Sequence, residues 1–472
     1  MKNTSDTRVH AFGDDAIGDL DAVGVADAIA SGTITAVEAT EAAIARAESV
    51  EPHLSGIVHR AFDAALAEAA APAPGVFSGV PTFIKDNTAV AGMPTNHGTR
   101  AFVARPAPAD EPFTRQYRST GAVVLGKTTL PEFGFNASTE FEDGRPTRNP
   151  WHTDYSCGAS SGGSAAMVAS GVVPFAHAND GGGSIRIPAA ACGLVGLKMT
   201  RGREEIGADA KGMPVNIVSN GIVSRSVRDS AAFAAAIEQY RPVARLPRIG
   251  HVTGPSTRRL RIGLILDSLT PEPTDDETRA AVLDVAELAR GLGHRVVERP
   301  LPVGPEFVKH FSNYWALLGF SLHRFGPRLM DPSYDRSRND ALTKGLAREF
   351  SRRPWTLPGT IAGLRRSTQI YREAFRDVDV IMSPVLAHTT PLLGHLSPAN
   401  GFDVLFPRLL QYVGFTPANN ASGGPAISLP LAQTSTGLPL GIHVSADLGD
   451  ERTLLELAFE LEEARPFARI HP

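Results

Sequence analysis

Residues 158–189 read GASSGGSAAMVASGVVPFAHANDGGGSIRIPA, and the rest of the chain is organised around this stretch. Two clusters of glycine and serine, at 158–164 and 181–184, flank a segment of small residues that indicates a helix followed by a turn. Glycine lets a backbone approach a ligand more closely than a Cβ allows, and serine supplies a hydroxyl, so the pattern favours an active site. A flexible linker is the alternative, but apolar runs bound both clusters and the stiff run IRIP follows the second.

The composition excludes several classes of protein. The 472 residues allow two or three domains, or one large α/β domain. Basic and acidic residues nearly balance, 46 against 50, so neither nucleic acid nor a membrane surface is favoured as a partner. The N-terminus lacks the apolar core of a signal peptide, and no apolar run approaches the roughly 18 residues of a membrane span. We therefore expect a cytoplasmic protein.

The cysteines point in the same direction. Cys157 and Cys192 are too few to enclose a metal ion, and no histidine pair lies near either at ligand spacing. We therefore expect no metal and no cofactor. Free thiols also suit a reducing compartment such as the cytoplasm.

The N-terminal part, residues 1–72, is expected to be helical, because most of it is rich in alanine and follows a helical period. Thr35 and Glu38 match a capping box, in which each side chain satisfies the other residue's backbone amide. The helix that they open is expected to run to about Val50, before the proline that follows.

A short apolar strand within residues 79–87, GVPTFIKDN, is expected to end at Lys85. A lysine at the end of a strand is ordinarily solvated, but burial lowers the pKa of a lysine toward neutrality and makes it a base. On these residues alone, both interpretations stay open.

Residues 121–128, GAVVLGKT, match the pattern of a phosphate-binding P-loop. A P-loop needs its four variable residues to form a loop whose amides face phosphates, with a strand before the first glycine. Here those residues, 122–125, are themselves expected to form the strand. We therefore reject the P-loop and interpret Lys127 as a strand-end residue.

The second half of the chain predicts strands and helices in alternation. A strand at 261–266, a helix at 275–292 and a strand at 295–297 form a parallel βαβ unit. Residues 303–375 are helical and rich in aromatic residues, which are ordinarily core but also suit the lining of an apolar pocket. Near the C-terminus, a hairpin is expected within residues 426–444.

Two segments are expected to be loops. Residues 200–220 indicate a surface loop that borders a site. Residues 241–259 are rich in proline and arginine, which favours a surface loop or an insertion within a single domain.

The two glycine and serine clusters together resemble a family signature. GASSGGS at 158–164 followed by DGGGSIRIPA at 180–189, with Lys85 upstream, resembles the amidase signature family of serine hydrolases, and the chain is similar to its aryl acylamidases, nylon cyclic-dimer hydrolases and urethanases. Other segments also match the family, at 121–133, 147–151, 193–203 and 424–430. The resemblance implies a single α/β domain over residues 1–472, with a large twisted mixed β-sheet flanked by helices on both faces.

The resemblance implies a triad in which Ser184 is the nucleophile, Ser160 the bridging serine and Lys85 the general base. A serine hydroxyl is a weak nucleophile at neutral pH and needs a base within hydrogen-bond reach, here neutral Lys85 acting through Ser160. A nearby carboxylate would keep the lysine charged, so Asp86 is expected to point elsewhere. A cis peptide bond between Ala159 and Ser160 is also implied.

Further roles are implied around the triad. Backbone N–H groups of Gly181, Gly182, Gly183 and Ser184 are expected to form the oxyanion hole, which stabilises the charge on the tetrahedral intermediate. Ser161 is expected to support the triad through a hydrogen bond. Asp180 and Arg186 are expected to shape the glycine loop.

Two departures from the family pattern bear on function. Gly181 stands where a larger residue is common, and Ile187 stands where tRNA-linked amidotransferase subunits usually carry Gln. Both favour a free-standing enzyme. An A-type subunit of a partner-dependent tRNA amidotransferase is the alternative.

The two serines also allow a different hydrolase class. The sequence GASSG at 158–162 matches the nucleophile elbow of α/β-hydrolases, which would make Ser160 the nucleophile. That elbow must follow a strand, and residues 148–157, RNPWHTDYSC, do not resemble one. A non-catalytic binding protein on the same fold is also conceivable, and the complete triad argues against it.

We therefore expect an amidohydrolase that cleaves a carbon–nitrogen bond of a small or polymer-derived amide through a Ser184 acyl-enzyme. Carbamates and esters are left open as substrates. The expected partner is a small-molecule amide or carbamate, with no nucleic acid and no membrane, and a homodimer is left open.

Overall fold

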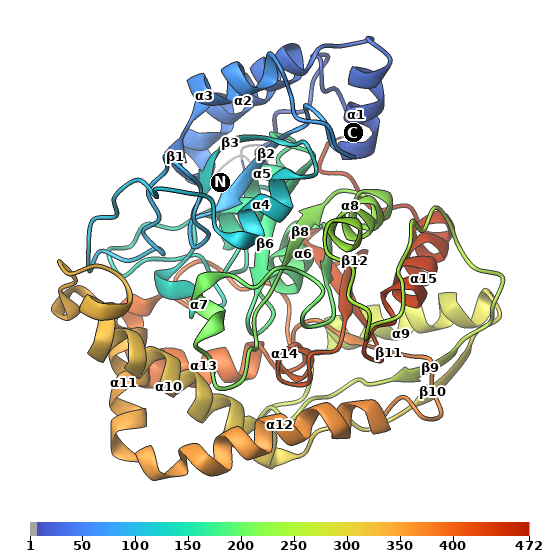
Figure 1. The fold of residues 1–472 in the computed structure, drawn as a ribbon. Helices are drawn as coiled ribbons and strands as arrows, with labels where there is room; N and C mark the ends of the chain where they lie inside the picture. Colours follow the sequence, from blue (N-terminus) through green and yellow to red (C-terminus); the bar gives the residue numbers. More distant parts are fainter. Residues whose placement is uncertain (1–6, 472) are drawn as a thin grey trace, which may run out of the picture.

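The computed structural model describes residues 7–471. At its centre is a mixed eight-stranded sheet (Figure 1). In spatial order its strands are β10 (Arg295–Glu298), β9 (Arg261–Leu264), β11 (Val380–Pro384), β13 (Pro439–Ala446), β12 (Ala426–Gln433), β7 (Val195–Lys198), β8 (Ser219–Ser224) and β6 (Phe175–Asp180). The pairs of β9 with β10 and with β11 are parallel, and every other neighbouring pair is antiparallel.

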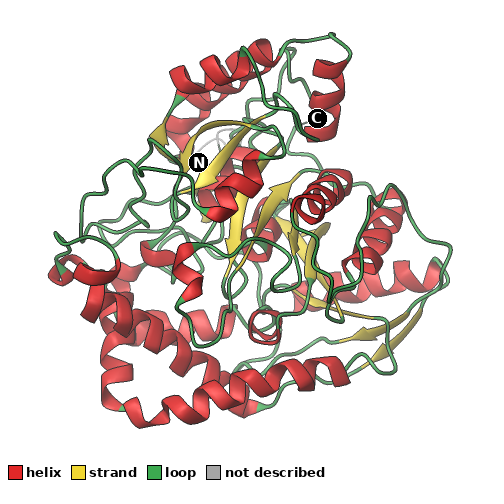
Figure 2. Cartoon of the chain, in the orientation of Figure 1, coloured by secondary structure: helices red, strands yellow, loops and turns green. Residues whose placement is uncertain are grey.

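Helices cover both faces of this sheet, as expected (Figure 2). Gly441 of β13 faces α6 (Arg186–Cys192), because a Cβ built at Gly441 would lie 2.5 Å from the Cβ of Ala190. Successive side chains of a strand point to opposite faces. Ile442 therefore points to the other face, where α15 (Glu451–Ala464) packs against β12 and β13. The expected single α/β domain is confirmed.

A smaller sheet with the order β1-β3-β2 lies beside the N-terminal helices, at the top of Figure 1. Its strands are β1 (Ile57–Arg60), β2 (Pro81–Lys85) and β3 (Val123–Thr128), and the helices are α1 (Ala22–Ala30), α2 (Ala36–Leu54), α3 (Phe62–Ala69) and α4 (Pro112–Arg118). β2 also packs beside β6 of the large sheet. This contact brings the end of the lysine strand to the second glycine cluster.

The capping box at the start of α2 is confirmed, with Thr35 and Glu38 bonded to each other's backbone amides. The predicted end of this helix is wrong, because α2 continues through Pro52 to Leu54. Pro52 lies in the last turn, and Ser55, which caps the helix after Leu54, has a left-handed φ of 54°.

Four strands of the two larger sheets are absent from the sequence-based prediction, namely β1, β6, β7 and β8. β6 reads FAHAND, which carries little intrinsic preference for a strand. Its pairing with β8 over the whole of its length, and its burial beside β2, override that preference. Pairing with a distant segment is tertiary information, which a local pattern lacks.

In the second half of the chain, strands and helices follow one another in the predicted order. The strand, helix and strand unit is confirmed as β9, α9 (Asp276–Gly291) and β10, and β12 with β13 forms the hairpin. Residues 241–259 run as a loop between α8 (Val227–Tyr240) and β9. The aromatic-rich region forms a helical layer, orange at the bottom of Figure 1, which α13 extends. Its helices are α10 (Pro305–Leu329), α11 (Ala341–Arg352), α12 (Leu357–Glu373) and α13 (Phe402–Tyr412).

The prediction that residues 148–157 form no strand is wrong. β4 (Arg148–Asn149) and β5 (His152–Ser156) pair antiparallel and form a two-stranded sheet of their own. The nucleophile elbow of α/β-hydrolases follows a strand of the main sheet. β5 lies outside that sheet, so the structure argues against the elbow on different grounds from the sequence.

None of the helices between residues 7 and 471 has the length and apolar character that a bilayer crossing requires.

Candidate active site

Lys85 is the last residue of β2, and its side chain is fully buried. Its Nζ donates hydrogen bonds to Ser160 Oγ at 2.8 Å and to Asn179 Oδ1 at 2.5 Å. Ser160 lies just before α5 (Gly162–Ala169), and Asn179 lies in β6. Residues from three separate elements therefore meet at one amine.

The electrostatics favour the neutral form of Lys85. Complete burial lowers its pKa well below the ordinary lysine value of 10.5, although the negative charge of Asp180 opposes the shift. Asp86, the neighbouring residue, accepts a hydrogen bond from the Asn96 amide and lies 3.4 Å from Lys127 Nζ. Asp86 therefore points away from Lys85, as expected.

Ser160 follows a cis peptide bond, Ala159–Ser160, which agrees with the family resemblance. Its Oγ is closely bounded by the backbone of Gly134, where an added Cβ would lie 2.8 Å away. Gly134 also has a left-handed φ of 70°, which glycine tolerates best. This glycine therefore leaves the space that the Ser160 hydroxyl needs.

Ser184 lies in the turn between β6 and α6 and lines the same cavity as Ser160. Between residues 7 and 471, no hydrogen bond joins the two serine hydroxyls. The structure thus joins Lys85 to Ser160 directly and leaves Ser184 facing the cavity beside them.

The glycine turn before Ser184 is fixed by two groups. The amide of Gly183 donates to Asp180 Oδ1 at 2.7 Å, and the carbonyl of Gly182 accepts from Thr416 Oγ1 at 2.6 Å. Gly183 has a φ of 136°, and a Cβ there would meet Thr416. The Gly183 amide is therefore engaged, whereas those of Gly181, Gly182 and Ser184 have no partner among the described residues.

Asp180 and Arg186 form a fully buried ion pair at the base of this turn, 2.9 Å apart. Burial opposes ionisation of Asp180, but Arg186 outweighs it and holds the pKa of the carboxyl well below its ordinary value. Arg186 also donates to Asn419 and Asn420. The pair therefore lies at the base of the glycine turn and holds the Gly183 amide through Asp180.

Ser161 differs from its expected place. Its Oγ contacts only the backbone of Asn179, 3.3 Å from both the N and the O atoms. It therefore reaches the lysine through Asn179 and makes no direct hydrogen bond with Lys85, Ser160 or Ser184 in the described chain.

Sequence reasoning missed Asn179, His177 and Thr416. His177 Nδ1 accepts a hydrogen bond from the backbone amide of Lys85, and burial lowers the pKa of His177 to about 3. The position of Asn179 directly before Asp180 was a usable signal, since it extends the second cluster by one polar residue. Thr416 gave none, because its contact with the turn joins residues 234 positions apart in the chain.

The two serines line a cavity of about 170 Å³. Two segments were expected to border a site, residues 200–220 and residues 303–375, and both contribute side chains to the lining of this cavity. Apart from the serines and the glycine turn, the lining residues are mostly apolar. They are Asn87, Phe133, Gly134, Phe135, Asn136, Ala137, Asn179, Ile187, Met213, Ile217, Val218, Phe311, Trp315, Leu318, Leu409, Leu410, Val413 and Pro417.

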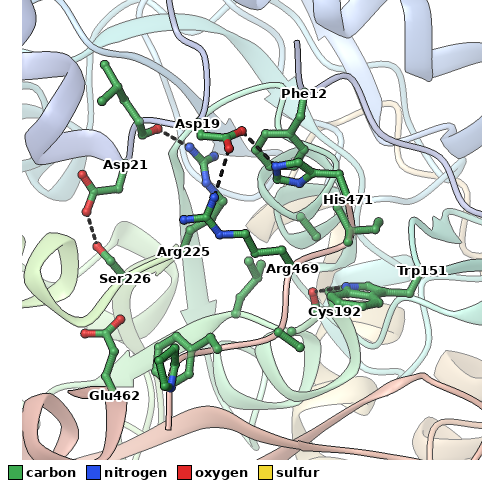
Figure 3. Close-up of a pocket in the computed structure, with 18 of the residues that line it drawn as sticks. Phe12, Asp19, Asp21, Trp151, Cys192, Arg225, Ser226, Glu462, Arg469 and His471 are labelled. Atoms are coloured by element: carbon green, nitrogen blue, oxygen red, sulfur yellow. Dashed lines mark hydrogen bonds and ion pairs between the residues drawn. The ribbon is translucent and has the colours of Figure 1, made fainter. Parts of the chain in front are cut away.

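A larger cavity of about 370 Å³ lies near the two ends of the chain (Figure 3). Several of its charged groups pair with one another, since Asp19 contacts both Arg469 and His471, and Asp21 accepts from Ser226. No predicted site residue belongs to the described lining of this cavity. The smaller cavity is therefore the candidate active site.

Fold and cavity together define the class: an α/β protein with a small, mostly apolar cavity that holds two serines beside a buried lysine. The sequence model of the Amidase family matches residues 38–455. AmiC of Mycobacterium leprae, which is named as a candidate amidase, is 51% identical over 98% of this chain and 99% of its own length.

Solved structures agree with this match. A 6-aminohexanoate cyclic dimer hydrolase complexed with substrate is 29% identical, with a TM-score of 0.88 over 96% of this chain and 98% of that one. A bacterial aryl acylamidase of the amidase signature family is 25% identical, with a TM-score of 0.82 over 95% and 96%. This chain therefore belongs to the Amidase family, and it is a hydrolase that acts on carbon–nitrogen bonds of amides.

Proposed function

We propose that this protein hydrolyses an amide through an acyl-enzyme on Ser184, with Ser160 and Lys85 relaying the proton. The single observation that supports the proposal most strongly is the 2.8 Å contact between Lys85 Nζ and Ser160 Oγ, at the wall of a cavity that Ser184 also lines. A buried lysine beside a serine, with a second serine open to a cavity, is a nucleophile with its base in place.

The first half of the reaction forms the acyl-enzyme. Neutral Lys85 takes the proton of Ser160 while Ser160 takes the proton of Ser184, whose oxygen attacks the amide carbonyl carbon. The tetrahedral intermediate then collapses as the carbon–nitrogen bond breaks, and the proton returns through Ser160 to the leaving amine. The two hydroxyls are not bonded to each other in the described structure. Catalytic hydrogen bonds often tighten only when substrate is bound.

The second half releases the acid. Water attacks the Ser184 ester, gives its proton to the same relay, and Ser184 leaves with a proton returned from Ser160. Each proton taken up by Lys85 in one step is given back in the next, so the enzyme returns to its starting state.

The oxyanion hole follows from the state of the glycine turn. Because the Gly183 amide already donates to Asp180, the donors assigned to the oxyanion are the amides of Gly181, Gly182 and Ser184. This assignment removes Gly183 from the expected set and keeps the other three donors. Loss of one oxyanion donor typically lowers kcat by about 100- to 1000-fold.

A fluorophosphonate, which phosphonylates an activated serine, tests the proposal. We expect peptide mass spectrometry to locate the adduct on Ser184, and labelling to be lost in Ser184→Ala and preserved in Ser170→Ala, a buried serine outside the cavity. An adduct on Ser160 would contradict the assigned nucleophile. No adduct on the isolated chain, with labelling restored by copurifying proteins, would favour the partner-dependent amidotransferase subunit.

A further inference from the structure

We propose that the cavity accepts an uncharged amide whose apolar part is about the size of one aromatic ring, and that it rejects amides carrying a charge on that part. The proposal rests on the proposed function, because it takes Ser184 as the group that attacks the amide. It narrows the substrate from amides in general to one class defined by charge and size.

The first observation is the chemistry of the wall. None of the described residues that line the cavity carries a charge. Lys85 contacts two of the lining residues, since its amine is engaged by Ser160 and Asn179, and burial lowers its pKa. A carboxylate or ammonium group on the substrate would therefore lose water and gain no partner of opposite charge.

The polar groups of the wall are also largely engaged. Asn136 donates from its side chain to the Leu396 carbonyl, and its Oδ1 accepts the amide of Ala137. Asn179 accepts from Lys85. The open polar groups include those of the glycine turn and Ser184, where the scissile amide belongs, and the buried Oδ1 of Asn87, which has no hydrogen-bond partner among the described residues. Beyond these groups the substrate meets mostly apolar side chains.

The second observation is size. The cavity holds about 170 Å³. An apolar protein cavity of about 150 Å³ binds benzene, so one ring or an aliphatic group of similar volume fills this space and two rings exceed it.

The third observation is which residues set that limit. Phe311 of α10 lies over Gly182, where a Cβ would be 3.7 Å from its ring, and Val218 lies over Gly181 at the same distance. These side chains form the wall next to the oxyanion amides. Phe311 therefore limits how large a group can lie beside the scissile carbonyl.

A panel of arylacetamides tests charge, with ammonia release as the readout. 4-Nitrophenylacetamide and 4-carboxyphenylacetamide have similar shapes and differ in charge, as do the 4-ethyl and 4-aminomethyl compounds. Burying an unpaired charge in an apolar site costs at least as much free energy as a difference of about 100-fold between two rate constants corresponds to. We therefore expect kcat/KM of each charged compound to be about 100-fold or more below that of its neutral partner. Equal kcat/KM within either pair would overturn the proposal.

A variant tests size. We expect wild type to prefer phenylacetamide to biphenyl-4-ylacetamide, and Phe311→Ala to raise the relative kcat/KM of the two-ring compound by about 10-fold or more. Phe325→Ala, on the same helix but outside the cavity, serves as the control and should leave the ratio unchanged. A wild type that hydrolyses both compounds equally well overturns the size limit, even if Phe311→Ala does not fold.

A variant that introduces a charge into the cavity wall completes the test. Leu410 lines the cavity and is half-buried, so Leu410→Asp places a carboxylate at its wall. We expect this variant to raise kcat/KM of the 4-aminomethyl compound relative to that of its 4-ethyl partner, and to lower kcat/KM of the 4-carboxy compound relative to that of its 4-nitro partner. An unchanged ratio would contradict the role of wall charge.

Fluorophosphonate labelling separates the two proposals. Labelling of Ser184 together with hydrolysis of charged and neutral amides alike leaves the proposed function intact and overturns the substrate class. Labelling of Ser184 without hydrolysis of any neutral member also overturns the substrate class. Absence of labelling and of turnover overturns both.

Discussion

Asn179 Oδ1 lies 2.5 Å from Lys85 Nζ and accepts its hydrogen bond. The partner of the buried amine is thus a neutral amide, while the nearby carboxylate of Asp180 is paired with Arg186. The backbone of Asn179 is in turn held by Ser161 Oγ. The hydrogen bond between Lys85 and Asn179 therefore orients the amine toward Ser160 without adding a negative charge that would keep the lysine protonated.

Asn179→Asp tests this relationship. A carboxylate at hydrogen-bond distance stabilises the charged lysine, and an opposite charge this close shifts a pKa by about 1 to 3 units. We expect the acid limb of the pH profile of kcat/KM to move to higher pH by that amount. Asn179→Ser, which keeps an oxygen without the charge, is the control and should leave the limb near its wild-type position.

The wild-type pH profile is a second prediction. Lys85 acts as a base only when neutral, so kcat/KM should rise as the pH rises through the pKa of Lys85 and then level off. Because burial lowers that pKa, the rise should lie well below 10.5. A rise centred near 10.5 would contradict a buried, neutral base.

Replacement of the base gives a third prediction. Lys85→Met should lower kcat by roughly 100- to 10,000-fold, the range for loss of a general base. It should also raise thermal stability at neutral pH. Between the lowered pKa of Lys85 in the folded chain and 10.5, the unfolded chain binds a proton at this lysine that the folded chain does not, so Lys85 lowers the free energy of unfolding there.

The stability gain of Lys85→Met should shrink as the pH approaches 10.5, where the unfolded lysine also loses its proton. Lys309→Met, at an exposed lysine on α10, is the control and should change neither activity nor this pH dependence. Thermal unfolding monitored by circular dichroism over a series of pH values measures both effects.

Gly134 offers a fourth prediction. A Cβ at this position would lie 2.8 Å from Ser160 Oγ, so Gly134→Ala should displace that hydroxyl and lower kcat by about 100-fold. Gly92→Ala is a matched control, because Gly92 has a similar left-handed φ, 79° against 70°, and no atom within 4 Å of the added Cβ. Equal loss of activity in both variants would mean that backbone strain alone causes it.

A fifth prediction concerns Glu132, next to the cavity segment that includes Phe133 and Gly134. Burial and the neighbouring Asp340 raise the pKa of Glu132 to about 8. The folded chain therefore holds a proton that the unfolded chain releases above pH 4.5, so stability from this group falls as the pH rises from about 4.5 to about 8. Glu132→Gln should flatten that decline, as measured by thermal unfolding. A slope equal to wild type would contradict the raised pKa.

Much of the site was predictable because its residues lie in two short clusters. The order of Ser160, Asp180 and Ser184 along the chain, with Lys85 at the end of an apolar strand, is visible without a structure. The capping box, the βαβ unit and the final hairpin were also predictable, because each depends on neighbouring residues.

The family, the α/β class and the candidate serines and lysine were therefore accessible from the amino-acid order, because they depend on residue types in a fixed local pattern. Three further features became visible in the fold. The Gly183 amide is engaged by Asp180, Ser161 contacts the backbone of Asn179, and Phe311 lies over Gly182. The strands β6 and β8 also belong to this second group. All of these depend on which distant segments come together, and burial and pairing across the chain carry that information, whereas local propensity does not.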